Sequence, residues 1–169
     1  MSTLSVGDLQ GLAVNSNVVT VPTGHTLNAV DGLQIGGTAI GTWTSYTPSF
    51  TNFTLGNGTA TARYAQVNDL VFVEGQVVLG STSVMGSTPQ ISHPVGTSSL
   101  EVFISNTLRY DNYGVGNYVG TLWIYPNKIY LGTLSTGGTW AGGGFINATT
   151  PFAWGTGDVF TWHYFYRTI

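Results

Sequence analysis

The stretch "TATARYAQVNDLVFVEGQVVL" (residues 59–79) contains two segments of alternating side chains on either side of Asn68 and Asp69. Alternation with a period of two places successive side chains on opposite faces of a β-strand. A short Asn-Asp turn between two such segments is typical of a β-hairpin. We therefore predict an antiparallel strand pair in which one strand has an apolar face made of Val71, Val73, Val77 and Leu79.

The composition of the whole chain agrees with this local pattern. Of its 169 residues 24 are glycine, and charged residues make up 7%, against roughly 25% in an average soluble domain. Aromatic residues make up 13%, which is too many for a disordered chain. Glycine with abundant Thr, Ser and Asn is typical of short strands joined by tight turns. We predict an all-β protein.

Several classes of function are not expected from the totals. The net charge is −3 and no basic run occurs, so we expect no nucleic-acid binding, which relies on clustered Lys and Arg. No segment approaches the ~20 apolar residues of a membrane helix, and the N-terminus does not resemble a secretion signal. With no cysteine, disulfides, thiolate catalysis and Cys-based zinc sites are excluded. We expect no cofactor.

Further strands are predicted along the chain. Residues 99–107 alternate, and residues 118–125 and 129–134 flank the turn sequence "PNK" as a second hairpin. Two glycine-rich segments, "RYDNYGVGNY" (109–118) and "STGGTWAGGGF" (135–145), are interpreted as loops. Together these elements predict an antiparallel β-sandwich, similar to a jelly roll, over residues 42–169.

The final segment, "DVFTWHYFYRTI" (158–169), carries large apolar residues at both odd and even positions. A strand that is apolar on both faces must be covered on both faces. In a small sandwich the opposing sheet supplies one cover, and a neighbouring subunit is the simplest source of the other. We predict a homo-oligomer whose interface contains Phe160, Trp162, Tyr164 and Tyr166.

Residues 1–41 differ in texture from the rest of the chain. Short apolar groups at 18–21, 27–30 and 33–35 are separated by turn sequences, and no aromatic residue occurs before Trp43. One copy of this segment cannot bury a core, but several copies wound around an axis could. We expect an intertwined β stem or docking arm, and a flexible arm is the alternative.

A search for catalytic or metal-binding groups finds no convincing set. The histidines at 25, 93 and 163 lack ligand spacing, although the axis of an oligomer could trap an ion on His25 or His163. Asp111 with Glu101 is the only plausible carboxylate couple, and most acidic residues lie in turn sequences such as "TGD". We predict that the protein is not an enzyme.

The remaining candidate is a contact surface of aromatic and amide side chains in the two glycine-rich segments. Tyr and Trp stack on the apolar faces of sugars while amides bond to the hydroxyl groups. Tyrosine is also common at loop edges and subunit interfaces, so each single residue has this simpler explanation. The predicted glycan-contact residues are Tyr110, Asn112, Tyr113, Asn117, Tyr118 and Trp140.

Residues 43–67, "WTSYTPSFTNFTLGNGTATARYAQV", resemble a recurring module of bacteriophage tail-fibre and minor tail proteins. The similarity extends to a glycine in the next strand, to "WGTGD" before the last strand, and to the opening "MSTLSVGDLQ". The matching positions are Trp43, Tyr46–Pro48, Leu55–Thr59, Ala62–Tyr64, Gly75, Trp154 and Thr156–Asp158.

The resemblance implies a setting for the predicted oligomer. It implies a C-terminal β-sandwich that trimerises about a fibre axis and an N-terminal region that attaches to other structural proteins of the virion. The expected function is that of a short homotrimeric tail fibre or spike, exposed on the virion, that contributes to host-surface glycan recognition. The alternative is a head decoration fibre with a purely structural role, and a glycan-cleaving spike is a third class. The residues expected at the virion are Leu4, Val6, Leu9 and Leu12.

Overall fold

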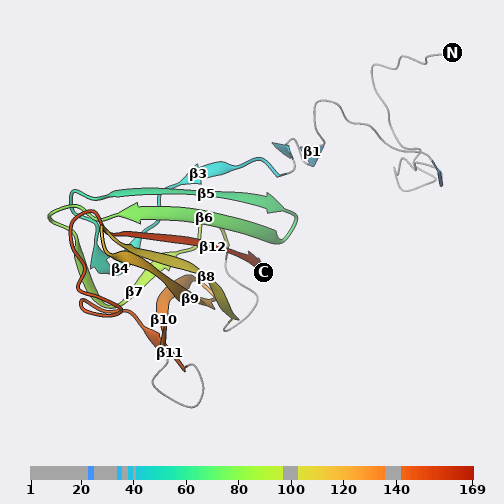
Figure 1. Ribbon diagram of the computed structural model, residues 1–169. Coiled ribbons are helices and arrows are strands. Elements are labelled where there is room, and N and C mark those ends of the chain that lie inside the picture. The colour runs from blue at the N-terminus through green and yellow to red at the C-terminus, as the bar shows by residue number, and fades with distance from the viewer. Residues whose placement is uncertain (1–22, 25–33, 36–37, 40, 97–102, 136–141) are drawn as a thin grey trace.

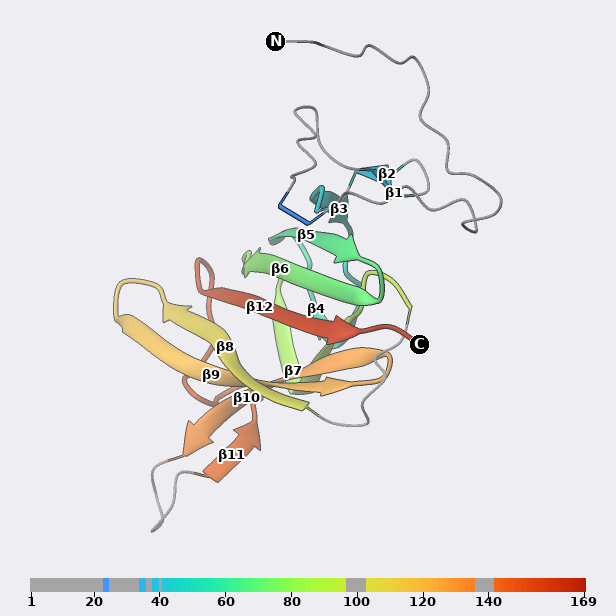
Figure 2. The same ribbon diagram turned by 90° about the vertical axis from the view of Figure 1, so that its right-hand side faces the viewer.

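A computed structural model describes residues 23–24, 34–35, 38–39, 41–96, 103–135 and 142–169. These residues are all-β and include no helix (Figures 1 and 2). Within these ranges, no helix is long and apolar enough to cross a membrane. The expected virion-docking residues, the arm of residues 1–41 apart from a few positions, Glu101 and Trp140 lie outside the described residues.

The described residues form twelve strands, and all pairings between these strands are antiparallel. A two-strand sheet pairs β1 (Gln34–Ile35) with β2 (Thr38–Ala39). The other strands form one sheet and are β3 (Thr44–Tyr46), β4 (Phe50–Thr54), β5 (Thr59–Val67), β6 (Leu70–Val78), β7 (Val84–Ser92), β8 (Phe103–Asn112), β9 (Gly116–Tyr125), β10 (Lys128–Ser135), β11 (Gly142–Phe145) and β12 (Val159–Arg167).

The large sheet curls strongly into a half-barrel. Its order is β3-β5-β6-β12-β8-β9-β10-β7-β4, with β11 paired to β10 off this path. The two ends of this order, β3 and β4, are separated in sequence only by residues 47–49. Phe53 in β4 packs edge-on against Phe160 in β12, with ring centroids 5.6 Å apart. Strands distant in the sheet order therefore face each other across one core.

The single sheet corrects part of the predicted architecture. The all-β antiparallel class is confirmed, but a sandwich of two separate sheets is not what the chain forms. Backbone pairing continues from β12 through β8 and β9 to β10, so front and back belong to one sheet (Figure 2). The alternation within each strand is the same for a sheet curled on itself as for two stacked sheets. The sequence pattern alone could not distinguish them.

The hairpin predicted from residues 59–79 is confirmed. Strands β5 and β6 pair along their whole lengths, from Thr59 opposite Val78 to Val67 opposite Leu70. Asn68 adopts a left-handed backbone conformation with φ of 55°, as the turn chemistry favours. Asn52 and Thr88 also have a positive φ, 56° in each case. The apolar face named above is buried in the core.

The hairpin around "PNK" is also confirmed, as β9 and β10. The first glycine-rich segment, however, is mostly strand rather than loop. Strand β8 continues to Asn112 and pairs with β9, with Tyr110 opposite Tyr118, so only residues 113–115 form the turn. Tyrosine favours strands, and here that tendency and the pairing outweigh the turn tendency of Asn and Gly.

The last strand, β12, lies in the middle of the sheet between β6 and β8. The four aromatic side chains expected at a subunit interface, Phe160, Trp162, Tyr164 and Tyr166, are 1–4% exposed within the single chain. They pack in the core and are not available to a neighbouring subunit. The curled sheet covers this face of β12 by itself, and the exposed aromatic residue is Phe165 on the other face.

Candidate binding surface

The outer face of β3, β5, β6, β12, β8 and β9 is organised as rows of side chains that cross the strands. Residue pairing fixes these rows, because directly opposed residues point to the same side of a sheet. The charged row consists of Ser45, Arg63, Glu74 and His163. The hydroxyl–amide row consists of Thr61, Gln76, Thr161, Arg109 and Val119. The aromatic row consists of Ala65, Phe72 and Phe165, together with Trp43 just before β3.

The charged row and the hydroxyl–amide row form the floor of an open hollow of about 1060 Å³. Asn117 adds a further amide from β9. The two rows are polar except at Val119, but the hollow is also lined by Ala62, Leu108, Tyr118 and Trp162, so most of its exposed lining is apolar. Thr61, Gln76 and Thr161 make no side-chain hydrogen bond within the described part of the chain. Their hydroxyl and amide groups therefore face the hollow with donors and acceptors to offer a ligand.

The charges of this surface are paired inside the chain. The Nε of Arg63 lies 2.5 Å from the Oε1 of Glu74 on the adjacent strand. The Nη2 of Arg109 lies 3.0 Å from the Oδ2 of Asp111 and donates to the Oδ1 of Asn117 at 2.5 Å. Both guanidinium groups thus have a carboxylate partner. The hollow offers hydrogen bonds without an unpaired arginine or carboxylate, which favours a polar ligand that carries no charge.

The predicted glycan-contact residues do not gather in one place. Tyr110 is fully buried and its hydroxyl donates to the Gly132 carbonyl oxygen at 2.7 Å, so its predicted role as a contact residue is wrong. Tyr118 lies on the inner side of the sheet, where its ring packs 5.1 Å from that of Phe152. Of the six predicted residues, Asn117 and Tyr118 line the hollow.

Tyr113 lies at the turn between β8 and β9 and is 74% exposed, while Asn112 ends β8 and is half-buried. The backbone N–H of Tyr113 donates to the Oδ1 of Asp158 at 2.8 Å. The Oδ2 of Asp158 accepts from the Gly155 N–H at 2.6 Å, as expected for an Asp in a "TGD" turn. Asp158 is 3% exposed and joins two turns that are distant in sequence.

Sequence reasoning missed most residues of the hollow. The pairing of Arg63 with Glu74 follows from the alternation and the Asn-Asp turn of the first hairpin, so it could have been found. The position of Arg109 beside Asn117 could not, because the Asn and Gly residues of this segment favour a loop, whereas the chain forms the paired strands β8 and β9. The position of Thr161 on the floor of the hollow was not predicted, because its neighbours in β12 are mostly apolar and indicated a buried strand.

No group of three or more His, Asp or Glu residues could hold a metal ion in the part of the chain that the structure describes. Asp111 pairs with Arg109, and its suggested partner Glu101 lies outside the described residues, as does His25. His163 belongs to the charged row, and the role suggested for it at an oligomer axis stays a prediction.

A second polar cluster is enclosed by the sheet. The Nε2 of His93 lies 2.8 Å from the Tyr125 carbonyl oxygen, and its Nδ1 lies 3.0 Å from the Tyr164 hydroxyl. Because a carbonyl only accepts, Nε2–H donates to it, and in the neutral ring Nδ1 accepts from Tyr164. The His93 ring stacks on Tyr166 at 4.3 Å. Burial lowers the pKa of His93 and raises the pKa of Tyr166 to about 12.

No protein-family model, curated protein or solved structure matches this chain.

Proposed function

We propose that this chain is a structural virion protein of a bacteriophage, a short homotrimeric tail fibre or spike. Residues 1–41 form an intertwined stem that attaches to the virion, and residues 42–169 form the outward head. The head binds an uncharged host-surface glycan in the hollow above the charged and hydroxyl–amide rows. The observation that carries this proposal is the hollow itself, about 1060 Å³ in volume, whose lining combines hydroxyl, amide and ion-paired side chains with apolar surface from residues such as Leu108, Tyr118 and Trp162.

The chemistry of the floor suits a sugar. Sugar hydroxyl groups donate and accept hydrogen bonds, and Thr61, Gln76 and Thr161 offer both kinds of partner. An acidic polysaccharide would have to compete with Glu74 and Asp111 for the two arginines. A neutral one leaves both ion pairs intact. A single site of this kind is expected to bind weakly, and the copies in a trimer increase the avidity.

The resemblance supports the same proposal. Its Ala62–Tyr64 element lies in β5, and its glycine, Gly75, lies in β6, and both strands build the hollow. Its Leu55–Thr59 element contains the turn that leads into β5. These parts of the motif lie on strands that form the hollow, which supports the proposal.

The test measures binding of the full chain to a panel of neutral and acidic bacterial surface polysaccharides by calorimetry. Thr161→Lys places a long charged side chain in the hollow, and Thr54→Lys is the matched change on an exposed position of β4, outside the hollow. We expect the first to weaken binding to a neutral polysaccharide by about tenfold or more, and the second to leave it unchanged.

Equal binding by both variants would show that the hollow is not the site. If no polysaccharide binds, and electron microscopy of virions places the protein on the head, the decoration role replaces the proposed one.

A further inference from the structure

The aromatic row lies at one end of the outer face, beside the hollow. Trp43, Phe72 and Phe165 are 43%, 40% and 53% exposed. The rings of Phe72 and Phe165 are 6.2 Å apart on adjacent strands, and Ala65 lies opposite Phe72 on its other side. Large aromatic side chains that line up on an exposed sheet face mark an interaction surface more often than isolated ones.

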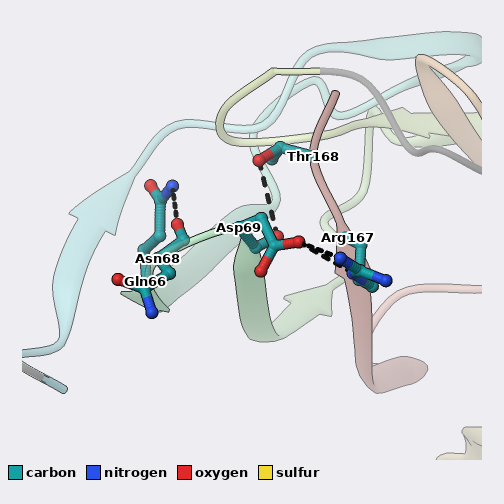
Figure 3. Close-up of polar contacts among 5 residues, drawn as sticks. All are labelled: Gln66, Asn68, Asp69, Arg167 and Thr168. Atoms are coloured by element: carbon teal, nitrogen blue, oxygen red, sulfur yellow. Dashed lines mark hydrogen bonds and ion pairs between the residues drawn. The ribbon is translucent and has the colours of Figure 1, made fainter.

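The place of this row in the fold indicates what covers it. Trp43 directly precedes β3, so the row begins where residues 1–41 join the sheet. Phe165 lies close to the end of β12, which is fixed to the β5–β6 turn (Figure 3). There, Arg167 donates to the Oδ2 of Asp69 through Nε at 2.8 Å, and the Thr168 N–H donates to the Asp69 carbonyl at 2.7 Å. In the proposed oligomer, copies joined through residues 1–41 would bring these ends of their sheets together.

The charges beside the row are balanced. The Arg63–Glu74 pair lies on one side of it, and the Asp69–Arg167 pair lies on the other. All four side chains are at least 40% exposed. A strongly acidic or basic partner would gain no net electrostatic attraction from these balanced ion pairs. A second copy presents the same aromatic row, with one positive and one negative charge on each side of it. Exposed ion pairs contribute little stability, so exchanging partners between copies costs little.

We propose that the three exposed side chains of the aromatic row, Trp43, Phe72 and Phe165, form the contact between copies of this chain, whereas Ala65 between them is 5% exposed. The inference rests on the proposed function, because it names the surface through which the head domains of the oligomer meet. It replaces the predicted contact through Phe160 and its neighbours, which the core of one chain already buries.

The first test is sedimentation velocity of the full chain over a range of concentrations. We expect the wild-type chain to be oligomeric and the Phe72→Ser, Phe165→Ser double variant to dissociate at concentrations about 100-fold higher than the wild type does. Tyr113→Ser is the control, because Tyr113 is a more exposed aromatic residue at the far turn of β8 and β9. We expect it to sediment like the wild type.

The second test does not depend on the folding of the double variant. The chain has no cysteine, so Phe165→Cys introduces a single thiol into the row. A short bis-maleimide should link two copies of this variant, and it should not link copies of Tyr113→Cys. A wild-type oligomer that yields no linked Phe165→Cys dimer overturns the interface and leaves the assembly standing. A monomeric wild-type chain overturns both the interface and the oligomeric part of the proposed function. Linked dimers with both cysteines show contact without selectivity and also overturn the inference.

Discussion

The indole of Trp162 in β12 packs directly on the backbone of Gly75, its partner residue in β6. A Cβ atom at position 75 would lie 2.6 Å from the Cε2 of Trp162. Since Trp162 is 2% exposed, its ring cannot move aside into solvent. The absence of a side chain at residue 75 is therefore what allows the largest core residue to lie flat against the sheet.

Gly75→Ala should lower the free energy of unfolding by about 1–3 kcal/mol, the usual cost of overpacking a core. Chemical denaturation followed by tryptophan fluorescence measures this change. Gly116→Ala in β9 is the control, because a Cβ at that position meets no atom within 4 Å. A Gly75→Ala variant as stable as Gly116→Ala would show that the ring adjusts freely.

Stability should fall as the pH is lowered because of His93. Burial lowers its pKa in the folded protein, whereas in the unfolded chain the pKa returns to about 6.5. The unfolded chain therefore binds the proton first, so the stabilisation is complete above about pH 6.5 and is lost as the pH falls through the lower, folded pKa. The facing groups, the Tyr125 carbonyl, the Tyr164 hydroxyl and the Tyr166 ring, supply no negative charge to stabilise the protonated form.

The measurement is the denaturation midpoint between pH 7.5 and 5.5. We expect the midpoint of the wild-type protein to decrease on acidification and that of His93→Gln to change less. His163→Gln keeps the enclosed histidine and serves as the control for the loss of an imidazole. Equal pH dependence in the wild type and His93→Gln would assign the effect to other groups.

Asp158 should act as a clamp between two turns. Asp158→Ala removes the acceptors of the Tyr113 and Gly155 N–H groups, and we expect a loss of about 1–3 kcal/mol. Asp158→Asn keeps one acceptor oxygen and should give an intermediate stability. Hydrogen exchange at the amides of Tyr113 and Gly155 should accelerate in the same order. Exchange at these two amides that is unaffected by the alanine variant would contradict the clamp.

The Arg63–Glu74 pair should affect the selectivity for ligands of different charge more than it affects the stability of the fold. Both side chains are exposed, so Glu74→Gln should change the free energy of unfolding by less than about 1 kcal/mol. The variant leaves the Arg63 charge uncompensated in the hollow, and binding should shift from neutral towards acidic polysaccharides in a salt-sensitive way. Asp69→Asn frees Arg167 outside the hollow and is the control. Unchanged selectivity in Glu74→Gln would show that the pair does not face the ligand.

The sequence supported the strand class and the two hairpins because alternation and turn chemistry are local signals. It could not support the curl of the sheet, since the contact between Phe53 and Phe160 joins segments far apart in the chain. The same limit explains the interface residues predicted from β12. Apolar residues on both faces showed that both faces need cover, but the chain itself supplies the cover for Trp162 and its neighbours.

The hollow was less predictable than the fold. Arg63 and Glu74 lie opposite each other within one hairpin, so the alternation of side chains and the position of the turn predict their pairing. Thr161 and Arg109 come together only because β12 pairs with β8 in one register. No local signal sets that register, and the segment that contains Arg109 was interpreted as a loop.

The central position of β12 has a consequence for biosynthesis. Among the described strands, β12 comes last in the sequence, yet it lies between β6 and β8 in the sheet. Until the ribosome has released Val159–Arg167, the nascent chain holds two incomplete sheets whose facing borders have open backbone groups, and such borders invite pairing with other chains. A premature stop before this segment would therefore yield aggregation-prone fragments rather than a shortened version of the domain.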